Sequence, residues 1–362
     1  MTRGFAGLAK LASDLLRAVW VSLIRPRRTR CDPHCNLPIQ TMIKNTSKLA
    51  GWAASSLALV ATAFADVKVN ENISVNGYAV GAVTSTDWDG GPTTETYFDS
   101  GVNSFDAVKL GVLASAGQVS AYGSVLYLPG AANEAGLLEA YATFDAGAGF
   151  KITGGKFLSY LGFEAFDAVN MTQLSYGLIS GIPAYHTGAK IDYSGEGFSI
   201  GVAVVDSIFN HPTKNVFFEG DREYGDDVGV EVMVSYTGVE NLTLFAGIAA
   251  EEDEHTNTDI FVFDLWASYA VSDKVTIAGE FAVNEDVATT WLAFLSYKFN
   301  DKVSTIFRIS GAEWDGGGDD MKYTIAPTYT INDNLALRAE FSLGEGDSGD
   351  YTFWGGQVVF KF

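Results

Sequence analysis

The feature that most constrains this fold is a period-two alternation of apolar and other residues, which recurs from residue 66 to the end of the chain. Successive side chains of a strand point to opposite faces, so this period predicts β-strands that each have one apolar face. In the segment 261–270, one face holds Phe261, Phe263, Leu265, Ala267 and Tyr269, and the other holds Val262, Asp264, Trp266, Ser268 and Ala270. Segments 228–236 and 335–344 repeat the pattern, and no helical period competes with it. The sequence predicts an all-β protein.

Two fold types fit such strands: a soluble sandwich with its apolar faces inside, and a membrane barrel with its apolar faces outside. The connections distinguish them. Sixteen strands are expected, starting near residues 73, 105, 118, 136, 150, 184, 198, 228, 241, 258, 275, 289, 303, 321, 335 and 351. Short turns such as 115–118 and 331–334 alternate with longer, acidic, glycine-rich connections such as 84–104, 208–227, 251–255 and 313–320. A sandwich with Greek-key crossovers does not sort its connections in this way.

We therefore predict a transmembrane antiparallel up-and-down β-barrel of about sixteen strands, with short periplasmic turns and longer extracellular loops. The last expected strand carries Trp354, Phe360 and the final residue Phe362 on one face. An aromatic strand left unpaired in water would be an aggregation hazard. We expect this strand to pair with the first one and close the barrel.

Residues 42–65 have the composition of a secretory signal. Lys44 and Lys48 come shortly after Met42, residues 49–64 are apolar, and Ala63-Phe64-Ala65 forms a small-x-small cleavage site before Asp66. A membrane-spanning helix is the alternative, but the apolar run is shorter than the roughly 20 residues that a span needs. We predict cleavage between Ala65 and Asp66 and a barrel domain over 66–362. Export together with the barrel pattern indicates the outer membrane of a Gram-negative-type bacterium.

Residues 1–41 differ in composition from the rest of the chain. They hold seven of the 23 Lys and Arg residues and both cysteines, Cys31 and Cys35, on either side of His34. Three potential ligands in five residues are a weak signal for zinc, which takes four. We interpret residues 1–41 as the product of a mis-assigned upstream start, with an unusually long leader as the alternative.

The expected mature chain is strongly acidic. Nine Lys/Arg and two Asp/Glu precede Asp66, so the mature chain keeps 14 basic and 42 acidic residues, a net charge of −28 with His neutral. This balance argues against nucleic acid and anionic lipid headgroups as ligands. The mature chain contains no cysteine, which suits a protein that crosses an oxidising periplasm unfolded.

One region carries a family resemblance. Its motifs are Leu137-Leu138-Glu139-Ala140-Tyr141, Gly154-Gly155-Lys156-Phe157, Leu161-Gly162-Phe163-Glu164, Asn170, Ser175 and Pro183-Ala184-Tyr185-His186-Thr187-Gly188. Residues 137–194 resemble the outer-membrane β-barrel porins of the OmpL-like group, and the rest of the mature chain is similar in style. The resemblance implies a barrel that passes small solutes and that barrel-assembly machinery recognises by its aromatic end, Phe360 and Phe362. It supplies no catalytic residue and no defined ligand.

The segment 157–183 is the least certain part of the strand assignment. A connection this long in a compact barrel usually has a function. It either folds into the lumen and narrows it, with Glu164, Asp167 and Asn170 offering polar contacts, or forms an extracellular hairpin that extends the wall. The sequence favours neither interpretation.

The alternation also identifies charged side chains that face the lumen. They are Glu139, Lys190, Asp192, Glu231, Asp264, Glu280, Arg308, Lys322, Arg338 and Glu340. Rings of charge at a constriction set ion preference, whereas charges that pair across strands only keep a lumen polar. The basic residues at 308, 322 and 338 and the acidic residues at 231, 264 and 280 lie on separate groups of strands, which is consistent with a transverse field.

An enzyme is not expected. The mature chain has three histidines, of which only His186 lies on an expected strand, and no serine nucleophile motif accompanies it. We interpret His186 as a structural hydrogen-bonding residue and a further candidate for the pore lining. The acidic loops 251–255 and 315–320 offer oxygen ligands for Ca²⁺, but their spacing matches no twelve-residue EF-hand loop, and we interpret them as solvated, repulsive surface. No metal or other cofactor is predicted.

The prediction is thus an outer-membrane porin: a passive, water-filled channel for small hydrophilic solutes or ions, with a modest preference for cations. The alternative is a plugged barrel that acts as a structural or adhesive surface protein. Outer-membrane lipid, barrel-assembly machinery and small hydrophilic solutes are the expected partners. The sequence leaves open the solute and whether the barrel is a monomer or a homotrimer.

Overall fold

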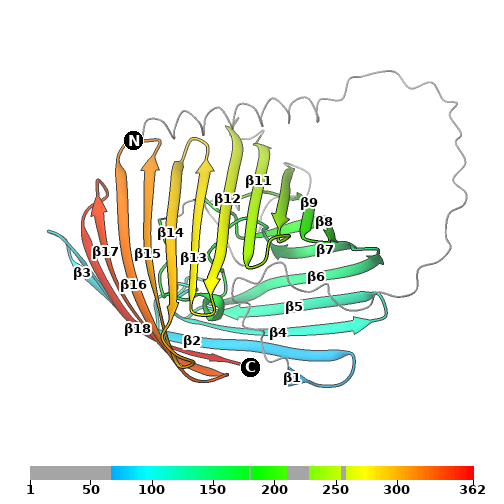
Figure 1. The fold of residues 1–362 in the computed structure, drawn as a ribbon, viewed down its shortest axis with the longest axis horizontal. Coiled ribbons are helices and arrows are strands. Elements are labelled where there is room, and N and C mark those ends of the chain that lie inside the picture. The colour runs from blue at the N-terminus through cyan, green and yellow to red at the C-terminus, as the bar shows by residue number, and fades with distance from the viewer. Residues whose placement is uncertain (1–66, 179–180, 210–227, 254–257) are drawn as a thin grey trace, which may run out of the picture. The chain divides into compact units, whose positions relative to one another are not determined.

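The computed structural model describes residues 67–178, 181–209, 228–253 and 258–362 (Figure 1). The predicted signal 42–65, the Ala65–Asp66 cleavage site and the upstream residues 1–41 lie outside the described residues. No helix in the described ranges is long and apolar enough to cross a membrane.

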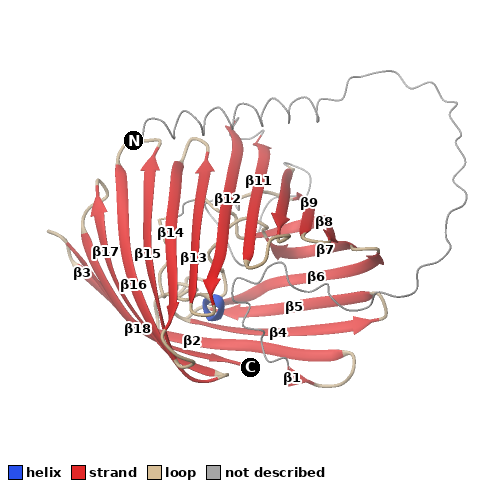
Figure 2. Ribbon diagram, in the orientation of Figure 1, coloured by secondary structure: helices blue, strands red, loops and turns tan. Residues whose placement is uncertain are grey.

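Antiparallel strands dominate the structure (Figure 2). The strands are β1 (Val67–Lys68), β2 (Ile73–Trp88), β3 (Thr93–Tyr97), β4 (Ala107–Ala116), β5 (Val119–Tyr127), β6 (Ala135–Gly147), β7 (Phe150–Leu158), β8 (Tyr185–Gly195), β9 (Phe198–Val205), β10 (Gly229–Tyr236), β11 (Leu242–Asp253), β12 (Thr258–Ser272), β13 (Val275–Asn284), β14 (Ala288–Lys298), β15 (Val303–Trp314), β16 (Asp319–Asn332), β17 (Leu335–Gly346) and β18 (Tyr351–Lys361). One short 3₁₀ helix, η1 (Ala168–Asn170), lies between β7 and β8.

Sixteen of these strands, β2 and β4 to β18, form a closed barrel in which each pairs with its neighbours in sequence and β18 pairs with β2. The predicted fold and strand number are confirmed, and each barrel strand starts within two residues of its predicted position. Two connections differ from the prediction. The connection 313–320 is shorter than expected, because β15 extends to Trp314 and β16 begins at Asp319. The region 84–104 is not a simple loop, because β2 continues to Trp88 and β3 pairs with it. The threonines of this hairpin favour extended backbone. The hydroxyl groups of Thr84 and Thr96 form a hydrogen bond across it, with 2.7 Å between their oxygen atoms.

The strands present their apolar faces outward, as the barrel interpretation requires. On β15, Phe307 and Ile309 are 45% and 41% exposed, while the intervening Arg308 is buried. In a water-soluble protein this exposure would be unfavourable, but the outer face of a membrane barrel contacts lipid.

The predicted closure by the C-terminal strand is also present. Beyond the β18–β2 ladder, the Phe362 amide donates to the Gly77 carbonyl and the Gly77 amide donates to the Phe362 carbonyl, both at 2.9 Å. A Cβ at Gly77 would lie 2.5 Å from the Lys109 carbonyl oxygen and 2.8 Å from the Phe362 ring. Glycine at position 77 therefore lets the last residue complete the wall.

Residues 159–184, between β7 and β8, contain η1 as their only regular element in the described part (blue in Figure 2). They bond to inward side chains of strands spread around the ring, from β2 and β4 to β17. A segment can touch strands so far apart only from inside the barrel. We call residues 159–178 and 181–184 the inserted segment, and of the two interpretations of this region the structure shows the one that folds into the lumen.

Candidate functional site

The candidate site consists of the inserted segment and the inward side chains that hold it. On one side of the barrel, three carboxylates accept hydrogen bonds from its backbone. Glu231 of β10 accepts from the Tyr160 amide at 3.2 Å. Asp264 of β12 accepts from the Gly162 amide at 2.7 Å, and Glu280 of β13 accepts from the Phe163 amide at 2.8 Å. The first part of the inserted segment thus presents its N–H groups to acidic side chains.

Basic side chains bind the later part of the segment through its carbonyl oxygens. Arg338 of β17 donates to the Met171 carbonyl at 2.5 Å and to the carbonyls of Ala168 and Gln173 at 3.3 Å. Lys322 of β16 donates to the Tyr176 carbonyl at 2.9 Å.

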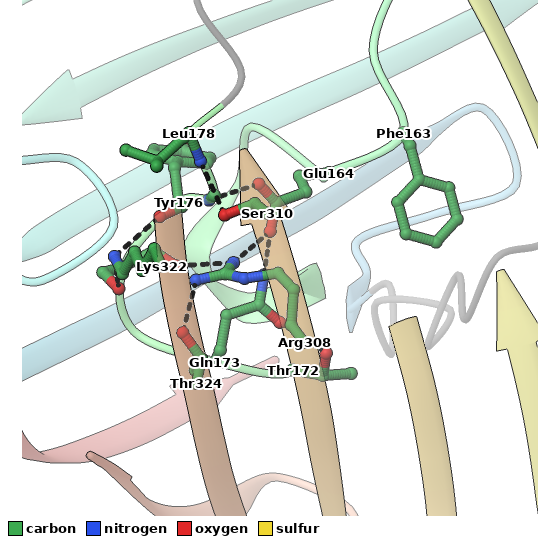
Figure 3. A network of polar contacts seen from close by, with 12 residues as sticks. Phe163, Glu164, Thr172, Gln173, Tyr176, Leu178, Arg308, Ser310, Lys322 and Thr324 are labelled. Atoms are coloured by element: carbon green, nitrogen blue, oxygen red, sulfur yellow. Dashed lines mark hydrogen bonds and ion pairs between the residues drawn. The ribbon is translucent and has the colours of Figure 1, made fainter. Parts of the chain in front are cut away.

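Arg308 of β15 extends this basic group (Figure 3). It donates to the Ser175 carbonyl at 3.0 Å and forms an ion pair with Glu164 of the segment. Its second terminal nitrogen donates to the Thr324 hydroxyl at 3.1 Å. A charge-assisted contact of this kind between buried groups is strong, because neither partner has water as an alternative.

The two clusters of opposite charge lie on β10–β13 and β15–β17, as the alternation indicated. The inserted segment covers both of them. Arg308 and Glu231 are only 1% and 0% exposed, and Lys322 and Arg338 are 5% and 6% exposed. These charged groups therefore contact the inserted segment and are shielded by it from a solute in the lumen.

Glu340 of β17 is an acidic residue within the basic group. It accepts hydrogen bonds from the Leu174 amide at 2.6 Å, from the Ser175 amide at 2.9 Å and from the Ser175 hydroxyl. Lys322 donates to that same hydroxyl at 2.6 Å. Ser175 thereby links a base and an acid of the wall.

A third group of contacts holds the segment on the part of the wall that contains β2, β4 and β6. Asp167 accepts hydrogen bonds from Lys109 of β4 at 2.9 Å and from the Tyr78 hydroxyl of β2 at 3.1 Å. Lys109 also pairs with Glu139 of β6 at 2.8 Å. The backbone N–H of Asn170, in η1, donates a hydrogen bond to the Asp167 carbonyl at 2.9 Å. Lys109 was not among the predicted inward charges, although the same alternation could have identified it as an inward position of its strand.

His186 of β8 lies where the inserted segment ends, close to its starting residue Ser159. Its Nε2 is 2.9 Å from Glu231, its Nδ1 is 2.8 Å from the Ser207 carbonyl, and the Ser159 hydroxyl donates to Glu231 at 2.6 Å. The serine bonds to the carboxylate and not to the imidazole, so this group lacks the order of a nucleophilic triad. These contacts fit the structural role expected of His186.

Lys190 and Asp192 of β8 remain partly exposed, unlike the other inward charges discussed above. The Lys190 ammonium lies over the rings of Phe157 and Tyr160, 4.8 Å and 4.7 Å from their centroids. The Tyr160 hydroxyl donates to Asp192 at 2.6 Å. Gly201 makes room for this ring, because a Cβ there would lie 2.7 Å from the Tyr160 hydroxyl.

An aromatic contact complements the polar ones. Phe163 of the segment packs edge-on against Trp266 and Phe294, with centroids 5.8 Å and 5.7 Å apart, and Trp266 stacks on Phe245 at 5.1 Å. In the described part of the chain, no group of three or more His, Cys, Asp or Glu side chains is arranged to hold a metal ion. The polar and aromatic contacts together can position the segment across a lumen.

The profile of one protein family, described as "Putative beta-barrel porin-2, OmpL-like", matches residues 115–358. The chain belongs to this family. The match covers most of the barrel and agrees with the resemblance seen in the motifs of residues 137–194. No curated protein sequence matches the chain significantly.

Solved structures of porin barrels share the fold at low sequence identity. Pseudomonas putida OprB, in its high-pH structure, has a TM-score of 0.64 and 10% identity, over 80% of this chain and 94% of its own. An anion-selective porin from Comamonas acidovorans has a TM-score of 0.58 and 12% identity, over 80% and 99%. The trimer form of Vibrio cholerae OmpT has a TM-score of 0.52 and 14% identity, over 81% and 100%. Family and fold together identify an outer-membrane porin-type barrel and favour a channel over an enzyme.

Proposed function

We propose that this protein is a passive diffusion channel for small hydrophilic solutes and ions, narrowed by the inserted segment. The observation that carries the proposal is the anchoring of the inserted segment across the inside of a sixteen-stranded barrel. A barrel of this size encloses an aqueous lumen. A segment fixed inside that lumen narrows it and so limits the size of the solutes that can pass.

We further propose a modest preference for cations. The inward charges of the wall are of both signs and lie largely buried beneath the inserted segment, so they act less directly on an ion in the lumen. The acidic surplus of residues 66–362, a net −28, is then the main source of the preference. It concentrates counter-ions at the channel mouth. The similarity to an anion-selective porin concerns the fold and does not carry that selectivity over.

The direct test is planar-bilayer recording with the protein purified from outer membranes, compared with a variant in which residues 162–178 are replaced by a short Gly/Ser linker. We expect discrete conductance steps for the natural protein and clearly larger steps for the variant, because the lumen loses its obstruction. Equal steps from both proteins would contradict the proposed narrowing, and an absence of steps from both would contradict the channel.

The second candidate function is a plugged barrel with a structural or adhesive role at the surface. The burial of the inward charges beneath the segment favours this candidate, because a wide open lumen would leave such side chains exposed to water. The same recordings distinguish the two candidates. Silent natural protein together with a conducting linker variant would support the plug.

The proposed partners are outer-membrane lipid, the barrel-assembly machinery and small hydrophilic solutes. A homotrimer is also proposed, with support from the trimer form recorded for the similar OmpT barrel. Conductance that closes in three equal steps would support three channels per assembly, and single-step closure would favour a monomer.

A further inference from the structure

Asp264 and Glu280 form an unusual pair of side chains beneath the inserted segment. They lie on adjacent strands, β12 and β13, and are 0% and 4% exposed. One oxygen of each binds the segment, since Asp264 Oδ2 accepts from the Gly162 amide and Glu280 Oε1 from the Phe163 amide. Two carboxyl groups thus hold two consecutive peptide units.

The remaining oxygen of each carboxyl group lacks a donor. Asp264 Oδ1 and Glu280 Oε2 are both buried, and neither has a hydrogen-bond partner in the described structure. The two carboxyl groups are nevertheless diagonal neighbours on the same face of the wall, because Asp264 pairs with Ala282 and Trp266 pairs with Glu280 in the β12–β13 ladder. Two ionised carboxylates cannot hydrogen-bond to each other, because both are acceptors only.

Three other acids of the segment and its anchors each have a basic partner, and Glu340 shares the Ser175 hydroxyl with Lys322. Glu231 has His186, Glu164 has Arg308 and Asp167 has Lys109. Among the described ion pairs, none includes Asp264 or Glu280.

The groups that face the pair offer no compensating charge either. The inserted segment contributes Glu164, which adds a further negative charge. From β15, Arg308 is already bonded to Glu164, and from β10, Glu231 is bonded to His186. On β14, the buried Thr290 hydroxyl has no partner and reaches neither carboxyl group.

We propose that Asp264 and Glu280 share a single proton at neutral pH and act together as the positioning residues for Gly162 and Phe163. One carboxylic acid O–H donates to the other residue's carboxylate, and the proton comes from solvent when the barrel folds. The pair then carries one negative charge in place of two. Two adjacent buried carboxyls that share a proton avoid both the mutual repulsion and the desolvation of a second ion.

The shared proton satisfies all four carboxyl oxygens at once. Two accept segment amides, and the other two form the O–H···O bond. The arrangement therefore fixes the start of the inserted segment without a metal ion. The positioning role rests on the proposed channel, whereas the proton itself is a property of the folded barrel alone.

Infrared difference spectroscopy of the full protein in lipid tests the proton directly. At neutral pH we expect the carbonyl absorption of an un-ionised carboxylic acid, and we expect it to be lost in both Asp264→Asn and Glu280→Gln. Glu231→Gln is the matched control, because Glu231 is equally buried and also accepts a segment amide but has a basic partner. That variant should keep the band.

Absence of the band in the natural protein, or its persistence in both Asp264→Asn and Glu280→Gln, would overturn the proposal. If a variant does not fold, the natural protein is titrated to alkaline pH instead. The carboxylic acid band should then disappear while the amide absorption of the β-strands remains. Parallel conductance recordings separate the two proposals. A band without conductance would count against the channel only, and conductance without a band would count against the shared proton only.

Discussion

At the scale of single residues, the inward charges of this barrel bind peptide groups. Acidic side chains accept hydrogen bonds from the backbone amides of residues 160, 162 and 163, and basic side chains donate to the carbonyls of residues 168, 171, 173, 175 and 176. Each side chain satisfies a backbone group that would otherwise be buried without a partner, which would cost about 1–3 kcal/mol. The anchoring is therefore distributed over many contacts, among which the ion pair between Glu164 and Arg308 is deeply buried.

Arg308→Met should leave the Glu164 carboxylate buried without a counter-charge. Breaking a buried ion pair from one side costs about 3–5 kcal/mol, so we expect a clearly lower denaturant midpoint for the barrel in lipid, together with larger conductance steps as the segment loosens. The double variant Glu164→Gln/Arg308→Met should recover much of the stability, because no charge is then left unpaired. Lys298→Met is a surface control: its pair with Asp301 is solvent-exposed and should matter little. A midpoint for Arg308→Met equal to that of the control would contradict a stabilising role for the pair.

At the scale of elements, the wall depends on how its two ends meet. The β18–β2 ladder continues through the two hydrogen bonds between Gly77 and Phe362, so the last residue belongs to the wall. An open sheet edge inside a membrane would leave backbone groups without partners at a cost of several kcal/mol each. Closure is thus a condition for insertion as well as for shape.

Gly77→Val should impair closure, because a side chain at that position meets the Lys109 carbonyl and the Phe362 ring. We expect a several-fold lower yield of folded barrel, measured as the fraction that keeps its compact mobility on an unheated denaturing gel. Gly356→Val is the matched control on the partner strand, since nothing lies within 4 Å of a Cβ there. Similar yields for the two variants would show that the close approach at Gly77 is unimportant.

At the scale of the whole molecule, the outer face is apolar and the inward charges of the wall are of both signs. The proposed cation preference therefore depends on the acidic surplus of the chain as a whole. The proposed ion preference is then an electrostatic effect of many acids at the mouth and not of one ring at a constriction. Such an effect is screened by salt, with a Debye length of about 10 Å at 0.1 M and about 3 Å at 1 M.

The cation preference should therefore fall as the pH is lowered through about 4, where ordinary Asp and Glu side chains take up protons and lose their charge. Reversal potentials under a salt gradient measure this directly, and they should shift toward zero at low pH and again at high salt. A preference that persists under both conditions would instead point to a buried, fixed charge at the narrowest part. Anion preference at neutral pH would contradict the proposal itself.

Sequence alone determined the number of strands, their faces, their approximate starting positions and the closure by Phe362. These features depend on local properties, because the period of two and the turn residues are set by neighbours in the chain. The same alternation identified the inward charges, including Arg308, Lys322 and Arg338. It could also have identified Lys109, since the rule that applies to the other strands applies to β4.

Only the tertiary structure decided where the inserted segment lies and what the inward charges bind. The deciding contacts join residues 102, 117 and 166 positions apart, such as Gly162 with Asp264, Phe163 with Glu280 and Leu174 with Glu340. A segment without a period carries no local signal of which wall it will meet. Its position is fixed when the ring of strands closes around it and its peptide groups find buried partners of the opposite polarity.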